Sequence, residues 1–339
     1  MRSLTFLLLA AALSTGSASL VAQAAAPAPV TEQVSYKNAK DGASLTGALM
    51  LPAAPGPHPG VVLLTLAGAD ALTARLNGLG YAVLIPERRG MLAVEMMLQA
   101  TFQDLADDVQ AGVDYLRARP EVGAADVTLI GQGEDSPAAI IAAYGSPDPL
   151  PLILLAPPAF PGTETLQLEQ HGLAESRGYG RLALDSLDAY VAGLAQVVLA
   201  ERSAALREQR VYEFMTKAGT GLPRSANFPV TMEGQSHFFG SAWWWDRLSF
   251  DPIPVLQRVE SPVLVMIGLE DPFTDLPRYF PTMQRALQTG LSQGATLCTV
   301  EGRTRHEFSP VVVDVVTGWL AQRTGGSWQR VCIDPRGLR

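Results

Sequence analysis

The sequence has few of the residues that bind metals. Among its 339 residues there are two cysteines and four histidines, and the histidines lie far apart, at His58, His171, His237 and His306. None of them has a partner at the i, i+4 or C-x-x-C spacing that metal sites use. We therefore expect no metal centre. No glycine-rich phosphate loop occurs in the right context either, so we expect no cofactor.

Clustered positive charge and long apolar runs are also missing. The net charge is -8, and Arg88-Arg89 is the only compact basic feature, so a nucleic-acid partner is not expected. Beyond the N-terminus no stretch reaches the roughly 18 consecutive apolar residues of a membrane span, so none is expected in the mature chain. A composition of 47% hydrophobic and 17% charged residues predicts an ordinary globular protein.

The N-terminus has the three parts of a secretory signal. Arg2 is followed by the apolar run Leu4–Leu13 and by small residues that end in Ala22-Gln23-Ala24. We predict a signal peptide over 1–24, a Pro/Ala linker over 25–32, and export to the periplasm or beyond. An uncleaved anchor is the alternative.

The two cysteines fit an exported chain. Cys298 and Cys332 are an even count, and one disulfide between them would tie the C-terminal tail to the core. Two buried free thiols are the alternative, and the sequence does not decide between them.

Short apolar runs predict a parallel sheet. A hairpin is expected from Gln33–Lys37 and Leu45–Leu51, and helical patterns, clearest from 102 to 116, alternate with the later runs. This order predicts an α/β fold with helices on both faces of the sheet. The central strands, apolar on both faces, are expected at Gly60–Leu66, Tyr81–Pro86, Val127–Ile130, Leu150–Leu155 and Pro262–Ile267.

The alternation stops between about Pro161 and Pro252. Long helical patterns there are followed by an aromatic stretch that contains Phe238-Phe239 and Trp243-Trp244-Trp245. We interpret this region as an inserted helical cap whose aromatic rings pack against the core; lining a substrate pocket is the alternative. The predicted boundaries are 33–160 and 253–325 for the two parts of the core, 161–252 for the cap and 326–339 for a C-terminal tail.

Several local patterns occur in a familiar order: Gly60–Leu64, Gly80–Leu84 followed by Arg88-Arg89-Gly90, Asp104–Leu116, and Ser261–Val265. Together they resemble the α/β-hydrolase family, in its dienelactone-hydrolase-like and acyl-peptidase-like esterase branch, over roughly residues 33 to 323. The resemblance implies an α/β-hydrolase fold and a catalytic serine on a G-x-S-x-G turn, with the acid and the histidine of the triad following later in the chain.

The resemblance places two of the three triad residues. Asp271 follows an apolar strand and takes the position of the acid, and His306 precedes the last helix and takes the position of the histidine. The serine is missing, because Gly131-Gln132-Gly133-Glu134 puts Gly133 where the nucleophile should stand. Glycine adopts the positive φ of this turn at little cost, so Gly133 preserves the turn and removes the hydroxyl.

The oxyanion side of the implied site has also changed. Thr65-Leu66 replaces the family's His-Gly, so the N–H groups of Leu66 and Glu134 are the implied oxyanion donors, and the Leu66 side chain narrows the pocket. Ser136 is an alternative nucleophile, although we expect it to cap the following helix. Glu134 or Asp135 could attack as a carboxylate, as in dehalogenase relatives of this fold.

Two functional hypotheses follow. The first is a pseudoenzyme: an esterase-like protein disabled at Gly133 that binds a small ester-like or peptide-like ligand beneath its cap. The second is an active hydrolase of carboxylic esters or acyl-amides that uses another nucleophile or water activated by His306 and Asp271. In either case we expect His306 to be hydrogen-bonded to Asp271 and to share a cleft with Gly133. The oligomeric state is not indicated.

Overall fold

The computed structural model describes residues 30–65, 68–90, 93–218, 231–271, 274–305, 308–322 and 332–333. The predicted signal peptide lies outside these residues. The described strands form one nine-stranded sheet in the order β1-β2-β4-β3-β5-β6-β7-β8-β9. Their bounds are Val30–Lys37 (β1), Ser44–Leu51 (β2), His58–Leu64 (β3), Ala82–Pro86 (β4), Val122–Gln132 (β5), Leu152–Leu155 (β6), Val263–Gly268 (β7), Ala295–Val300 (β8) and Cys332–Ile333 (β9).

The centre of the sheet is parallel and its two margins are antiparallel. Strands β4, β3, β5, β6, β7 and β8 run parallel to one another, whereas β2 pairs antiparallel with both β1 and β4, and β9 pairs antiparallel with β8. The predicted opening hairpin is confirmed. It begins earlier than expected, so the predicted linker over 25–32 is too long. Val30 to Glu32, assigned to the linker, belong to β1 because their backbone pairs with Leu49 to Leu51 of β2.

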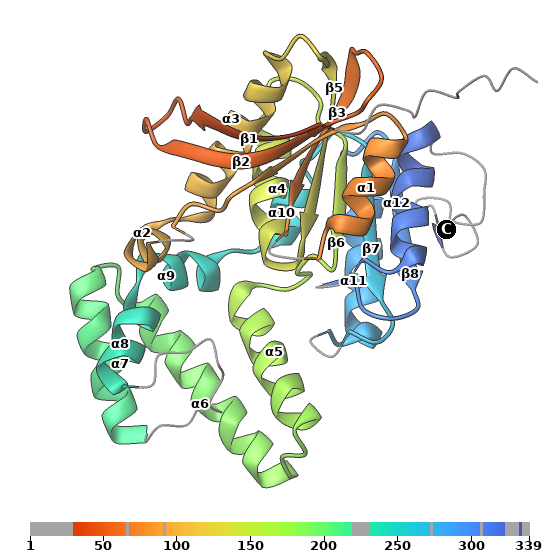
Figure 1. Cartoon of the computed structure of the whole chain (residues 1–339). Helices are drawn as coiled ribbons and strands as arrows, with labels where there is room; N and C mark the ends of the chain where they lie inside the picture. Colours follow the sequence, from red (N-terminus) through yellow and green to blue (C-terminus); the bar gives the residue numbers. More distant parts are fainter. Residues whose placement is uncertain are drawn as a thin grey trace, which may run out of the picture.

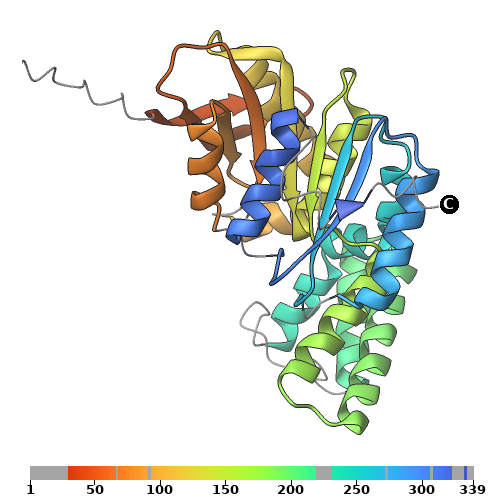
Figure 2. The same cartoon turned by 90° about the vertical axis from the view of Figure 1, so that its right-hand side faces the viewer.

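Alternate residues of the central strands contact two separate helical layers. In β3, Val61 and Leu63 belong to one buried cluster, and Val62 and Leu64 to the other. The first cluster is covered by α1 (Asp70–Gly78) and α12 (Pro310–Gln322), and the second by α3 (Phe102–Arg117) and α4 (Ser136–Gly145). Figures 1 and 2 show these layers on opposite faces of the sheet. Both faces are buried, which explains the nearly continuous apolar strands.

Five helices between β6 and β7 form the cap: α5 (Gly162–Ser176), α6 (Arg181–Ala200), α7 (Ala204–Ala218), α8 (Met232–Gly240) and α9 (Ala242–Ser249). Helices α5 to α8 lie beyond one end of the sheet (Figure 1). By length and composition alone, α6 is the one described helix that could cross a membrane, but it packs between α5 and α7 as a helix of the cap. The remaining helices are α2 (Val94–Gln99), α10 (Pro252–Leu256) and α11 (Leu276–Thr289).

The aromatic stretch joins the cap to the core. The ring of Trp243 packs edge-on against Phe102 of α3, with ring centroids 5.1 Å apart, and Phe250 contacts Phe102 at the same distance. The backbone N–H of Phe102 donates a 2.6 Å hydrogen bond to Asp246. Trp243 and Trp244 are buried. Most of this aromatic area therefore holds the cap on α3, as the first interpretation of the sequence expects.

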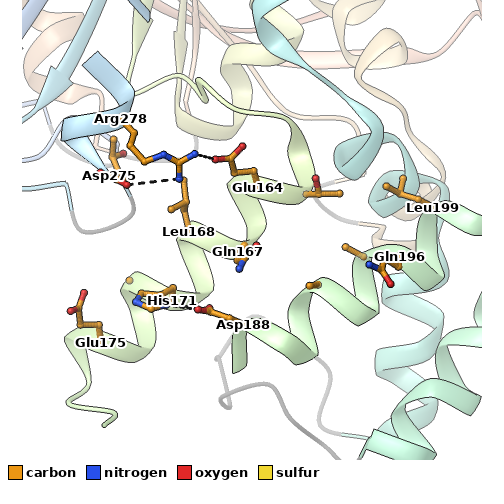
Figure 3. Close-up of a pocket in the computed structure, with 15 residues that line it drawn as sticks. Glu164, Gln167, Leu168, His171, Glu175, Asp188, Gln196, Leu199, Asp275 and Arg278 are labelled. Carbon is orange, nitrogen blue, oxygen red and sulfur yellow. Dashed lines mark hydrogen bonds and ion pairs between the residues drawn. The ribbon is translucent and has the colours of Figure 1, made fainter. Parts of the chain in front are cut away.

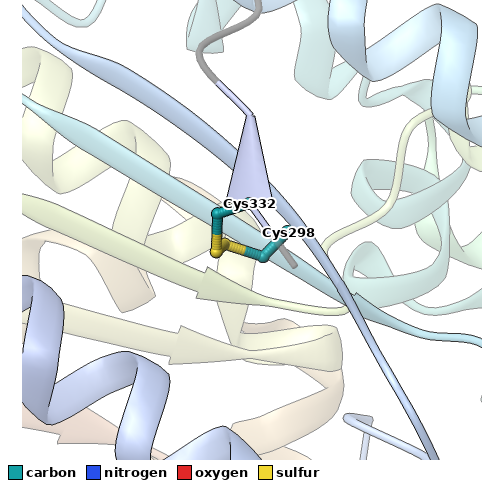
Figure 4. The surroundings of a disulfide bond; sticks show 2 residues. All are labelled: Cys298 and Cys332. Atoms are coloured by element: carbon teal, nitrogen blue, oxygen red, sulfur yellow. A yellow bond between two sulfur atoms is a disulfide. The ribbon is translucent and has the colours of Figure 1, made fainter. Parts of the chain in front are cut away.

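A disulfide between Cys298 and Cys332 joins the two strands at the far margin of the sheet (Figure 4). The two residues are directly opposite in the antiparallel β8–β9 pair. The bond closes a loop with a sequence separation of 34 residues. By the chain-entropy model a loop of this size stabilises the fold by roughly 3 to 4 kcal/mol. Of the two states that the sequence left open, the structure has the disulfide.

Candidate active site at the strand-to-helix turn

The turn after β5 has the geometry that presents a nucleophile in this fold. Strand β5 ends at Gln132, a single 3-10 turn covers Gly133 to Asp135, and α4 begins at Ser136. Gly133 has a φ of +53°, in the left-handed region that costs a residue with a side chain about 1 to 3 kcal/mol. A Cβ on Gly131 would lie only 2.8 Å from that of Ala139, so this glycine lets α4 pass close to the strand.

The space where a serine side chain would begin is already lined by Arg305. A Cβ placed on Gly133 would lie 3.3 Å from Cγ of Arg305 and 3.5 Å from its carbonyl oxygen. The first distance is tighter than an ordinary van der Waals contact, so a side chain at this position requires Arg305 to shift by a few tenths of an ångström. The position therefore lacks a nucleophile and also has little room for one.

Hydrogen bonds from Gln132 connect the turn to two other loops. Its side-chain oxygen accepts a 2.6 Å bond from the Thr65 hydroxyl after β3, and its side-chain nitrogen donates a 2.9 Å bond to the carbonyl of Thr304. The Thr304 hydroxyl accepts a 2.9 Å bond from the N–H of Gly268 at the end of β7. The ends of β3, β5 and β7 and the loop after β8 are thus held in fixed relation. Neither Gln132 nor Thr304 is predicted as a site residue from the sequence. The one local signal is that Gln132 stands next to Gly133.

A buried carboxylate from the cap lies between two arginines above Gly133. Glu169 of α5 accepts a 2.8 Å bond from Arg247 of α9 through one oxygen and a 2.6 Å bond from Arg305 through the other. Arg247 also pairs with Glu134 at 2.9 Å. The side chains of Glu169, Arg247 and Arg305 are only 10 to 11% exposed. The ion pairs therefore connect the cap, the turn and the loop that precedes His306.

The charges in this cluster stabilise one another. Arg247 is the main cause of the lowered pKa of Glu134, and burial acts against it. Burial lowers the pKa of Arg305, but the carboxylates of Glu169 and Asp271 outweigh this effect and raise it. The pKa of Arg247 is raised in the same way, since Glu134 and Glu169 outweigh the effect of burial. Both arginines and Glu134 are therefore charged near neutral pH.

Asp271, the expected triad acid, is buried beside this cluster. It is 5% exposed, and its Oδ2 lies 3.9 Å from Nε of Arg305. Burial and then the charge of Asp271 raise the pKa of Tyr279, whose hydroxyl donates a 2.9 Å bond to the carbonyl of Pro157. His306 and Leu66 lie outside the described residues, so the His306–Asp271 pair and the Leu66 oxyanion donor stay predictions.

Ser136 and Asp135 face away from the space above Gly133. The Ser136 hydroxyl is fully buried and donates a 3.2 Å bond to the carbonyl of Gly131, so it does not make the expected capping interaction with the start of α4. The carboxylate of Asp135 pairs with Arg88. Burial raises the pKa of Asp135, and Arg88 opposes that effect. Neither residue lines the cavity at Gly133.

Two cavities lie near α5, and they differ in size. The elbow cavity has about 30 Å³ of space, enough for roughly one water molecule, and is lined by Gly133, Glu134, Phe160, Glu169, Arg247 and Arg305, among others. The cap groove, between α5 and α6, has about 780 Å³ (Figure 3). The two share no lining residue. In the part of the chain that the structure describes, no cluster of His, Cys, Asp or Glu could hold a metal ion.

Solved structures that include an α/β hydrolase and an esterase domain have the same fold. A structure of DcsB with a substrate analogue superimposes with a TM-score of 0.57 and 14% identity, covering 88% of this chain and 100% of the other. The α/β hydrolase GrgF from Penicillium gives 0.50 and 15%, with 87% and 96% covered. The esterase domain of a Rhodothermus marinus protein gives 0.51 and 13%, with 86% and 97% covered. No protein-family model and no curated protein sequence matches the chain.

These likenesses agree with the topology described above. The mostly parallel sheet with helices on both faces is the α/β-hydrolase fold. At 13 to 15% identity the comparison shows the fold alone. The function must be argued from the site.

Proposed function

We propose that the protein is an exported α/β-hydrolase-fold protein with little or no serine-hydrolase activity that binds a small ligand beneath its cap. The observation that carries this proposal is Gly133, which keeps the left-handed turn conformation while Arg305 lies against the place of the missing side chain. The Gln132 and Thr304 hydrogen bonds support it further, since the loops around the turn remain held in place without a nucleophile.

The carboxylates at the turn are poor substitutes for the serine. Glu134 is paired with Arg247, and Asp135 with Arg88 on the other side of the turn. A nucleophilic carboxylate must be aimed at the substrate, and each of these carboxylates is instead held by an arginine through one of its oxygens.

A second candidate function is hydrolysis of carboxylic esters or acyl-amides by a water molecule. The elbow cavity favours it, because about 30 Å³ admits one water next to the loop that leads to His306. In this mechanism His306, oriented by Asp271, would remove a proton from the water, and no covalent intermediate would form.

Fluorophosphonate labelling tests the leading proposal, because the reagent reacts only with an activated serine. We expect no labelling of the purified wild-type protein, and labelling of Gly133→Ser if His306 and Asp271 are aligned. The matched control is Gly133→Ser combined with His306→Ala, which should label no better than wild type. Wild-type labelling that disappears in Ser136→Ala would overturn the proposal.

Ester turnover separates the two candidates. Hydrolysis of small activated esters by unlabelled wild-type protein, abolished by His306→Ala, would establish the water mechanism. Export is tested separately by cell fractionation and N-terminal sequencing: we expect a mature chain that begins near Ala25, and a chain that begins at Met1 in the cytoplasm would contradict it.

A further inference from the structure

The position of Glu169 resembles that of a bound ligand. Its carboxylate is the only group that α5 places in the ion-pair cluster among the described residues, and each of its oxygens takes one bond from a different arginine. A planar carboxylate held by two guanidinium groups is a strong and geometrically selective arrangement. Here it lines the same cavity as Gly133, the position of the missing nucleophile.

Arg247 can donate more hydrogen bonds than the described residues accept from it. Arg247 pairs through Nη1 with Glu134 and through Nη2 with Glu169, but its Nε is buried and has no hydrogen-bond partner among the described residues. This side chain is nine-tenths buried and lines the elbow cavity. A buried donor without a partner is costly, so the site favours one more acceptor than Glu169 supplies.

Withdrawal of Glu169 would leave a site for an anion. Nη2 of Arg247 and Nη1 of Arg305 would both lose the bond to Glu169 and would line the enlarged cavity. Two carboxylates stay beside the two guanidinium groups, Glu134 at 2.9 Å from Arg247 and Asp271 at 3.9 Å from Arg305. The remaining charges thus balance, and a ligand with one negative charge would restore the charge that Glu169 supplied.

We propose that this site binds the carboxylate of a small organic acid, and that Glu169 is an internal occupant that the ligand displaces when α5 moves away. The inference rests on the proposed ligand-binding function and names the ligand class. Phe160, Phe250 and Pro158 line the same cavity, so an apolar body attached to the carboxylate has side chains to pack against. A doubly charged phosphate fits less well, because Glu134 and Asp271 would repel its second charge.

Chemical rescue tests the proposal. We expect Glu169→Ala to lower the Tm by roughly 5 to 10 °C, because it removes the carboxylate that two buried guanidinium groups share. Millimolar acetate or butyrate should bring the Tm of this variant most of the way back to that of wild type. Sodium chloride and the neutral analogues acetamide and butyramide should not. The matched control is Glu164→Ala on the same helix, whose partner Arg278 is 54% exposed; its Tm should not respond to carboxylates differently from wild type.

Wild-type protein provides the second measurement. Because Glu169 competes with the ligand, calorimetry should show that butyrate binds wild type about tenfold or more weakly than it binds Glu169→Ala. The double variant Glu169→Ala/Arg305→Ala should lose the tighter binding of the single variant. Trp244 offers an independent signal, since the guanidinium of Arg247 lies 5.4 Å from its ring centroid. If Glu169→Ala proves unfolded, Glu169→Gln is the substitute, with a smaller gain expected.

The outcomes separate this inference from the proposed function. Folded Glu169→Ala protein whose Tm rises no more with butyrate than with butyramide would overturn the carboxylate site. Rescue of the variant without any binding of acetate or butyrate to wild type would also overturn it, because Glu169 would then be a purely structural partner. If inorganic phosphate raises the Tm of Glu169→Ala as much as butyrate does, the site does not select carboxylates and binds anions in general. Binding of a neutral ester analogue to wild type would preserve the proposed function in each case, and fluorophosphonate labelling of wild type would remove that function independently.

Discussion

Two of the Glu–Arg pairs that helix α5 makes contrast in almost every physical respect. Glu169 pairs with Arg305 in the elbow cavity, where both side chains are about nine-tenths buried. Glu164, on the same helix, pairs with Arg278 beside the cap groove, where the side chains are 33% and 54% exposed. The same two residue types therefore form a buried bond between cap and core in one place and a solvated pair in the other.

The two cavities also show that the larger volume does not have the more reactive lining. The cap groove is about 780 Å³ and the elbow cavity about 30 Å³, yet the smaller one contains the buried charges, the left-handed glycine and the Arg247 donor that has no partner among the described residues. In the groove His171 pairs with Asp188 at 3.0 Å, and both are substantially exposed (Figure 3). Solvated pairs carry little energy, so the volume of the groove alone does not indicate a function.

The largest expected effect comes from breaking the two pairs in the same way. Arg305→Ala should destabilise the fold by about 3 to 5 kcal/mol, because it leaves Glu169 and Asp271 buried with less compensation. Arg278→Ala should cost less than about 1 kcal/mol, because water screens its pair. Urea unfolding of both variants measures the difference. Equal losses would show that the elbow cluster is as well solvated as the groove.

The next effect compares two glycines with positive φ. Gly133→Ser should destabilise the protein by about 1 to 2 kcal/mol, since it combines the left-handed conformation with a Cβ 3.3 Å from Arg305. Gly178→Ser, in the loop between α5 and α6, meets no atom within 4 Å at its Cβ and should cost about 1 kcal/mol from conformation alone. The difference in unfolding free energy isolates the contact with Arg305. A Gly133→Ser protein no less stable than Gly178→Ser would mean that Arg305 yields freely.

The sequence predicted the local parts of this site better than the distant ones. The strands and the turn at Gly133 follow from apolar runs and from residues adjacent in the chain, so a pattern could reveal them. Glu169, Arg247 and Arg305 could not be found in this way. They come from α5, α9 and the loop after β8, and Glu169 is 136 residues from Arg305. A charged residue on a predicted helix ordinarily indicates a solvated face, and only the docking of the cap buries these three.

The smallest expected effect is a pH dependence of stability that comes from His237. This residue makes an exposed contact between cap and core, in contrast to the buried contact at Glu169. His237 of α8 lies 3.1 Å from Glu208 of α7 and 3.2 Å from Glu95 of α2. Hydrogen bonds to Glu208, and then to Glu95, raise the pKa of His237. Because the folded pKa is the higher one, the stabilisation is fully present below the unfolded pKa of about 6.5 and is lost as the pH rises through the folded value.

The exposure of His237 keeps this contribution small. The side chain is 45% exposed, so we expect less than about 1 kcal/mol of stability to be lost between pH 5.5 and 8.5 through this residue. His237→Gln should remove that part of the pH dependence, and 0.5 M salt should reduce it in wild type, because exposed charges are screened. Arg305→Ala should leave the same pH difference in place, since its partners in the elbow cluster do not include His237. An unchanged pH difference in His237→Gln would show that the exposed bridge between α2 and α8 contributes nothing to holding the cap on the core, and that the buried pairs of Glu169 and the packing of Trp243 on Phe102 account for that attachment.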